Sequence, residues 1–277
     1  MDKETLLRAV TAYVNTTAGN FIGEDIALRA DLKGMQVFEE PLMGFAKSED
    51  EYFARLKSPE VIGPHFIMPG EWLPGAKTVI SLFLPFTMRV KKANRIGRNW
   101  PAKEWLHARI EGQAFIADLC RSIQKQLAEE GFRSVVPLLD ERFATGNPKI
   151  QDKTQQGYYT SNWSERHVAH GCGLGTFGLS GGLITRKGIA GRYASLITDA
   201  PFEPSPRPYT GAYDYCIRCG ACVRNCPVQA ISQVQGKRHP ICSKFLDLTR
   251  EKYQPRYGCG KCQVNVPCEN GIPGYSR

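Results

Sequence analysis

Long hydrophobic runs are missing from this chain of 277 residues. Its longest apolar stretch, around residues 78–86, is far shorter than the roughly 20 residues that a membrane-spanning helix needs. A basic-then-apolar leader and a twin-arginine motif are also missing, because the chain opens with Met1-Asp2-Lys3-Glu4. We therefore expect a cytoplasmic protein without a membrane partner, in a compartment that keeps cysteines reduced.

Cysteine is scarce over the first 200 residues, where Cys120 and Cys172 occur without motif spacing and are expected in the core. The other eight of the ten cysteines are concentrated near the end of the chain. Four of them form Cys216-x2-Cys219-x2-Cys222-x3-Cys226-Pro227, the run typical of bacterial iron–sulfur ferredoxins.

This run predicts two [4Fe–4S] clusters, because three closely spaced thiolates wrap one cubane while the fourth cysteine ligates the other cluster. Such an arrangement needs four more cysteines, and the chain supplies four. The ligand set that we predict for the first cluster is Cys216, Cys219, Cys222 and Cys268. The set that we predict for the second cluster is Cys226, Cys242, Cys259 and Cys262. The sequence therefore predicts an electron-transfer protein.

Two other interpretations of the cysteines fit less well. A disulfide framework is typical of small secreted domains, which this chain is not. A zinc ribbon uses two C-x2-C pairs and needs neither the third close cysteine nor the proline.

The formal net charge of +9 raises the question of a nucleic-acid partner. Eight thiolates and two oxidised cubane cores would bring it to roughly +5. Basic residues gather near the cysteines, among them Arg218, Arg224, Lys237 and Lys244. They offset cluster charge or dock an acidic electron donor such as ferredoxin or flavodoxin, and we do not expect nucleic acid to bind.

Periodicity and turn residues predict an α+β architecture. Leu6, Val10 and Val14 indicate an amphipathic first helix, and a long helix is expected between Pro101 and Gly131. The expected strands are residues 78–84 and 134–139, with a hairpin formed by 183–185 and 193–198. The proline-rich residues 201–208 are expected to link a first domain, 1–200, to a cluster domain, 201–277.

The stretch Gly173-Leu174-Gly175-Thr176-Phe177-Gly178 matches G-x-G-x-x-G. A dinucleotide site is not expected, because that fingerprint follows a strand and opens a helix. Here a helical stretch, 164–170, comes first and a strand follows. The glycines indicate positive φ angles or a close approach of the backbone to something bulky, either a large planar cofactor or tightly packed protein.

Three stretches together resemble the epoxyqueuosine reductases. They are residues 73–81 (LPGAKTVIS), Ser164-Glu165-Arg166-His167 running into the glycine stretch, and the cysteine pattern with its lone Cys242 and residues 257–263 (YGCGKCQ). The wider group includes the reductive dehalogenases. The resemblance implies a degenerate nitroreductase-like cobalamin-binding domain followed by a ferredoxin-like double [4Fe–4S] module. It also implies a cobalamin-dependent reductase in which the clusters deliver low-potential electrons to the corrinoid.

The corrinoid contacts that the resemblance implies are Trp163, Arg166, Gly173, Gly175, Phe177 and Gly178. Where the family has an aspartate proton donor, six residues before the Glu-Arg pair, this chain has Tyr159. A phenolic hydroxyl can donate a proton to a reduced substrate, so Tyr159 is the expected catalytic acid.

The chain ends nine residues after Cys268, where the family continues into a helical repeat domain that helps hold transfer RNA. We therefore expect a small or medium organic substrate instead of transfer RNA. The alternative is an electron-transfer protein, or a reductive activator of a separate corrinoid protein, that has no substrate of its own.

Overall fold

The computed structural model describes residues 2–274. Its centre is a four-stranded antiparallel sheet in the order β1-β2-β6-β3. The strands are β1 (Leu42–Lys47), β2 (Thr78–Pro85), β3 (Ser134–Val135) and β6 (Gly191–Thr198). The longest ladder joins β2 to β6 over eight residue pairs, from Thr78↔Thr198 to Pro85↔Gly191. All eight residues of β2 are buried, as expected for a central strand.

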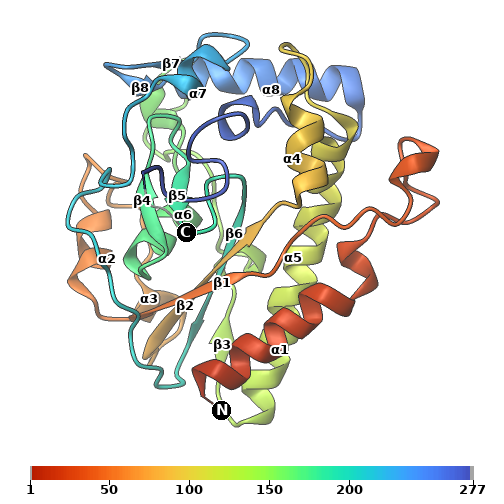
Figure 1. Cartoon of the computed structure of the whole chain (residues 1–277). Helices are drawn as coiled ribbons and strands as arrows, with labels where there is room; N and C mark the ends of the chain where they lie inside the picture. Colours follow the sequence, from red (N-terminus) through yellow and green to blue (C-terminus); the bar gives the residue numbers. More distant parts are fainter. Residues whose placement is uncertain (1, 275–277) are drawn as a thin grey trace.

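Helices cover both faces of this sheet (Figure 1). On one face lie α1 (Lys3–Thr16) and α5 (Lys103–Glu129), which pack on Ile80, Leu82 and Leu196. On the other face lie α2 (Glu51–Leu56) and α6 (Glu165–Gly171), with Val79 and Ile197 beneath them. The alternation of side chains along β2 and β6 therefore divides the core into two layers.

The expected first helix, central strand and long helix are all confirmed. In α1, Leu6, Val10 and Val14 are fully buried at spacings of one helical turn, and Asp2 caps the helix by accepting a hydrogen bond from the Thr5 amide. The long helix α5 ends just before Gly131, which adopts a positive φ of 82°.

Two expected strand arrangements are wrong. Of residues 134–139 only Ser134–Val135 pair in the sheet, because Pro137 starts a short 3-10 helix (Pro137–Leu139). The expected hairpin does not form either: β5 (Leu183–Thr185) pairs with β4 (Gly175–Phe177), while β6 pairs with β2 and β3. The chain turns at Thr185–Gly188 and then passes the cysteine segment, where the Ile189 amide donates to the Cys268 carbonyl.

The remaining short elements surround the sheet. Helix α3 (Pro69–Trp72) precedes β2, and α4 (Met88–Arg95) follows it. Short 3-10 helices span Ala18–Asn20, Ala30–Leu32 and Gln156–Tyr158. No helix within residues 2–274 is long and apolar enough to cross a membrane.

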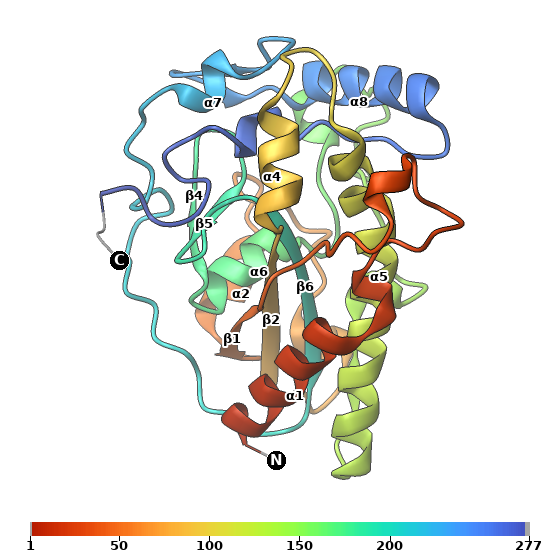
Figure 2. The same ribbon diagram turned by 45° about the vertical axis from the view of Figure 1, so that its right-hand side comes forward.

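The segment after residue 208 folds back over one end of α4 and α5 (Figure 2). It contains α7 (Ala221–Arg224), β7 (Ile231–Ser232), β8 (Gly236–Lys237), α8 (His239–Tyr253) and a 3-10 turn (Lys261–Gln263). Residues 201–208 contain no helix or strand, and the Ser205 amide within them donates to the Phe45 carbonyl of β1. The division into domains 1–200 and 201–277 stays a prediction.

Polar contacts fix the cysteine segment on α4. Asn94 Nδ2 donates to the Cys259 carbonyl (2.9 Å), and Lys261 Nζ donates to the Asn94 carbonyl (2.8 Å). Arg95 forms an ion pair with Glu269, whose side chain is 4% exposed. Because Cys259 and Glu269 are anchored directly, the position of the cysteines depends on helices far away in the sequence.

Candidate functional site

The eight clustered cysteines separate in space into two groups of four. Burial and neighbouring thiolates raise the pKa of Cys268 to about 12, and the neighbours are Cys222, Cys216 and Cys219. Burial likewise raises the pKa of Cys259 to about 12, with contributions from Cys262, Cys242 and Cys226. The two groups have the same members as the two predicted ligand sets, and their role as cluster ligands stays a prediction. The two groups are adjacent, because Cys262 also raises the pKa of Cys222.

The loops that carry the cysteines adopt backbone conformations that suit a tight wrap. Arg218, between Cys216 and Cys219, has a positive φ of 50°, and Gly220 has a φ of 71°. Gly260, between Cys259 and Cys262, has a φ of 65°, and a Cβ atom there would lie 1.9 Å from the ring of Trp105. Only glycine fits at position 260, so α5 and the second cysteine pair come into direct contact.

The first group lies at the surface. Cys219 is exposed, and neighbouring Ile217 is 55% exposed. The four thiols of this group line a small apolar hollow together with Ile184, Ile189 and Val266. Four cysteines that line one mostly apolar hollow supply the number and type of ligands that a cubane cluster needs.

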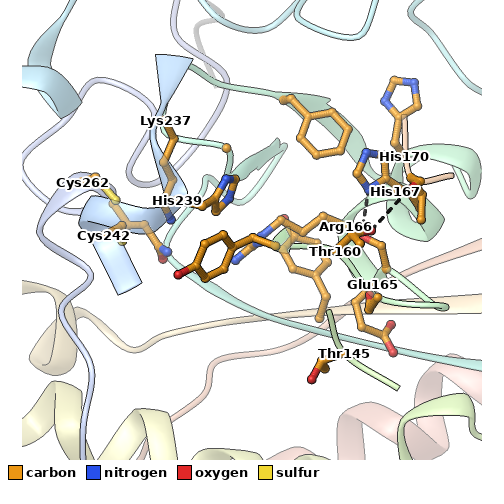
Figure 3. Close-up of a pocket in the computed structure, with 18 of the residues that line it drawn as sticks. Thr145, Thr160, Glu165, Arg166, His167, His170, Lys237, His239, Cys242 and Cys262 are labelled. Carbon is orange, nitrogen blue, oxygen red and sulfur yellow. Dashed lines mark hydrogen bonds between the residues drawn. The ribbon is translucent and has the colours of Figure 1, made fainter. Parts of the chain in front are cut away.

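The second group borders a cavity of about 1650 Å³. Cys226, Cys242, Cys259 and Cys262 all line this cavity. Figure 3 shows Arg166, His167 and His170 of α6 on one side, and His239, Cys242 and Cys262 on the other. Pockets for drug-sized ligands measure roughly 300–1,000 Å³. The cavity beside the second group is therefore larger than a pocket for one drug-sized ligand.

Of the residues predicted to act in catalysis or to contact the corrinoid, four line the cavity: Tyr159, Trp163, Arg166 and Phe177. The Tyr159 hydroxyl donates to the Lys153 carbonyl (2.9 Å), and its ring stacks on His239 with centroids 5.9 Å apart. Trp163 is buried and stacks on Phe66, with centroids 5.5 Å apart, so most of its surface contacts protein. The functional roles of all four residues stay predictions.

The three predicted glycines pack against protein. A Cβ atom at Gly175 would lie 1.9 Å from the Ile184 carbonyl oxygen, and one at Gly173 would lie 2.4 Å from the Pro206 carbonyl oxygen. Gly178 faces the Ile184 side chain. The helix before this motif and the strand β4 within it confirm that it lacks the dinucleotide-binding context. The close approach is thus explained by β5 and the proline-rich segment, and a corrinoid contact at these glycines stays a prediction.

Histidines in the cavity wall are held neutral. Burial lowers the pKa of His167 to about 4 and that of His239 to about 4, and it also lowers the pKa of His170. His170 Nδ1 lies 2.9 Å from the Gly175 carbonyl oxygen and therefore carries the proton. The Tyr209 hydroxyl, which also lines the cavity, donates to the His170 carbonyl (2.6 Å).

A buried carboxyl group reaches the cavity from the start of α6. Trp163 Nε1 donates to Ser195 Oγ (2.8 Å), which in turn donates to Glu165 Oε2 (2.7 Å). The other carboxyl oxygen, Glu165 Oε1, is buried without a hydrogen-bond partner among the described residues. Burial raises the pKa of Glu165 to about 7, although the bond from Ser195 opposes this. A carboxyl of this kind can hold a proton near neutral pH.

Sequence reasoning missed several residues of the cavity wall. Arg109 on α5 and Arg192 on β6 both line it, as do His239 and Tyr209. Of these four, Arg192 could have been found from the sequence, because it is a charged residue at the start of a strand whose last six residues are buried.

Comparison with known proteins supports this description. The 4Fe-4S binding domain family matches residues 212–232, which contain the four cysteines of the ferredoxin-like run. An epoxyqueuosine reductase from Listeria monocytogenes is 36% identical over 123 residues, 40% of this chain and 31% of that protein. A solved epoxyqueuosine reductase in complex with a tRNA-Tyr stem loop matches 98% of this chain and 67% of that one, at 19% identity and a TM-score of 0.53.

The chain resembles the epoxyqueuosine reductases in sequence and in fold. A catabolic reductive dehalogenase in complex with 3-bromo-4-hydroxybenzoic acid shares the fold over 84% of this chain and 30% of that one, at 15% identity and a TM-score of 0.53. The expected resemblance is confirmed, and so is a mixed α/β fold with an iron–sulfur motif. The nitroreductase-like character stays a prediction. The match to the Listeria protein spans about a third of that protein's length.

The raised pKa of Glu165 predicts a pH-dependent stability. Its value in the folded chain, about 7, lies above the ordinary value of 4.5, so the folded state binds the proton more tightly than the unfolded state. The stabilisation is complete below pH 4.5 and is lost as the pH rises through 7. Between pH 5 and 8 the chain should lose roughly 3 kcal/mol of unfolding free energy at this group.

Thermal or denaturant unfolding at pH 5 and pH 8 measures this loss. Glu165→Gln should remove most of the difference between the two pH values, and Glu141→Gln, at an exposed carboxyl, should leave it in place. An equal pH dependence in Glu165→Gln and in the unmodified chain would contradict a buried, protonated Glu165.

Proposed function

We propose that this protein is a cobalamin-dependent iron–sulfur oxidoreductase that reduces a small organic substrate in the cavity beside its second cysteine group. The observation that carries the proposal is the position of Cys226, Cys242, Cys259 and Cys262 in the wall of the 1650 Å³ cavity. An electron carrier without a substrate needs no such space. The resemblance to epoxyqueuosine reductases, which are reductases by name, supports an enzyme.

The chain's own residues fit both kinds of cofactor. Each group of four thiols would hold one [4Fe–4S] cluster, and the iron would supply the positive charge that the buried thiolates need. A corrinoid is a large ring with polar edges, and the cavity has both the volume and unpartnered polar atoms in its wall, Glu165 Oε1 and Arg192 Nε. When bound, it would supply a cobalt centre capable of reducing an organic substrate.

The two cysteine groups define a direction for electron transfer. The first group lies at the surface beside exposed Ile217, and the second borders the cavity. Electrons therefore enter at the first group. Arg218 and Arg224 flank this entry point, so an acidic donor such as ferredoxin or flavodoxin suits it.

Tyr159 is the proposed proton donor, and Arg166 is the proposed contact for an amide edge or a developing negative charge. The Tyr159 hydroxyl donates to the Lys153 carbonyl in the structure, so this bond has to exchange for one to the substrate. Glu165, protonated near neutral pH, is a second proton reservoir in the same wall.

Metal content tests the proposed function. Anaerobic purification from cells supplied with cobalamin should give about eight irons and one cobalt per chain. Eight irons without cobalt, and no uptake of added cobalamin, would contradict the proposal and leave an electron carrier or an activator of a separate corrinoid protein. Turnover of transfer RNA in preference to small substrates would overturn the substrate class.

The assignment of ligands to the two clusters is tested with Cys226→Ala. Because Cys226 belongs to the cavity group, the variant should lose most of the signal of that cluster and keep the other, with iron falling from about eight to about four per chain. Electron paramagnetic resonance of the reduced protein distinguishes the clusters. Cys216→Ala is the reciprocal variant, and damage to the same cluster in both variants would refute the assignment.

Substitution of the proposed proton donor should affect turnover alone. Tyr159→Phe removes the hydroxyl, so turnover should fall about 100-fold or more, while iron and cobalt content stay unchanged. Tyr158→Phe is the matched control, since its neighbouring ring does not line the cavity. Unaltered turnover in Tyr159→Phe would remove this residue from the mechanism.

A further inference from the structure

The wall of the cavity is strongly basic. Its charged side chains are Arg55, Arg109, Arg166, Arg192, Arg207 and Lys237, against Glu60 and Glu165. Arg207 forms an ion pair with Asp50, which does not line the cavity; Arg207 Nη2 lies 2.6 Å from Asp50 Oδ2. Lys237 and Arg166 act electrostatically on Cys262 and so offset charge at the second cluster. In the described part of the chain, Arg55, Arg109 and Arg192 have no such partner, and Arg55 lies apart from the other two, with its guanidinium carbon 5.6 Å from the ring centroid of Tyr52.

Arg192 is an unusual arginine. Its guanidinium donates to Gln113 Oε1, a neutral acceptor on α5, while its Nε is buried without a hydrogen-bond partner among the described residues. Within residues 2–274 no carboxylate forms an ion pair with it. A charged group with a buried polar atom that lacks a partner is costly to desolvate, so native proteins rarely keep one without a function.

Two further arginines add positive charge close to Arg192. Burial lowers the pKa of Arg192 to about 9, and the positive charges of Arg109 and Arg166 contribute. Arg109 lies against Tyr257, donating to its hydroxyl (2.8 Å) with its guanidinium carbon 4.7 Å from the ring centroid. Tyr257 thus fixes Arg109 without neutralising it. Arg192 and Arg109 both line the cavity, and their positive charges repel each other. An anion bound between them would remove this repulsion.

We propose that Arg192 and Arg109 form an oxyanion subsite that binds a carboxylate or phosphate group of a ligand in the cavity. A guanidinium matches the two oxygens of such a group in a bidentate arrangement. Two sources carry this chemistry: the phosphodiester of a corrinoid that bears a nucleotide, and an acidic substituent of the substrate. The inference rests on the proposed function only in requiring that one of these ligands enters the cavity.

Inorganic phosphate is the probe for the subsite. Isothermal titration of the cluster-loaded, corrinoid-free chain should show phosphate binding, and Arg192→Met should weaken it at least about 30-fold. Arg192→Lys keeps the charge but loses the forked geometry, so its affinity should lie between the two. Arg121→Met, which removes an exposed arginine elsewhere on α5, is the matched control and should bind like the unmodified chain.

Retention of the cluster absorbance shows that the variants are folded. Two results overturn the subsite: no phosphate binding by the unmodified chain, or equal affinity in Arg192→Met, Arg121→Met and the unmodified chain.

A second titration separates the two sources. Cobinamide, which lacks the nucleotide, is the comparison ligand. If cobalamin loading abolishes phosphate binding, and Arg192→Met removes a preference for cobalamin over cobinamide, then the cofactor's phosphodiester fills the subsite. If phosphate still binds to the cobalamin-loaded chain, the subsite receives the substrate. A chain that takes up no cobalamin but binds phosphate through Arg192 would contradict the proposed function and still support the subsite.

Discussion

Compensation of buried charge is the constraint on which the rest of this structure depends. The chain buries thiols whose pKa values, about 12 for Cys259 and Cys268, keep them protonated without a nearby cation. Bound iron would supply the positive charge that allows deprotonation, and metal binding would then be coupled to folding of this segment. The contacts from Asn94, Lys261 and Arg95 hold the cysteine loops in place for that binding.

The same principle describes the cavity wall. Its histidines are neutral because they are buried, Glu165 is held near its protonated form, and Arg192 keeps a positive charge without a carboxylate partner. A site with neutral imidazoles, a protonated acid and unpaired guanidinium groups favours anionic and electron-accepting ligands. This electrostatic character agrees with the proposed reduction of a bound organic group.

The sequence predicted those features in which short spacing decides the structure. The ferredoxin-like run is dictated by cluster geometry, and α1 and α5 follow from helical periodicity. The predictions from local sequence were wrong where tertiary contacts decide the structure. The expected strand 134–139 ends before Pro137, and β6 pairs with β2 over eight residues instead of forming a hairpin with β5. The sequence marks Arg192 only as a charged residue at the start of a buried strand, because its significance comes from Gln113 and Arg109, residues far away in the chain that the fold brings beside it.

The proposed function depends on a corrinoid in the cavity next to the second cysteine group. The most direct measurement is the paramagnetic resonance of Co(II) in the cobalamin-loaded chain, recorded with the clusters oxidised and then reduced. Because the cavity wall contains the predicted ligands of one cluster, we expect cluster reduction either to broaden the cobalt signal magnetically or to abolish it by passing an electron to Co(II). A cobalt signal that is unchanged by cluster reduction would place any bound corrinoid away from the second cysteine group and refute the proposed site.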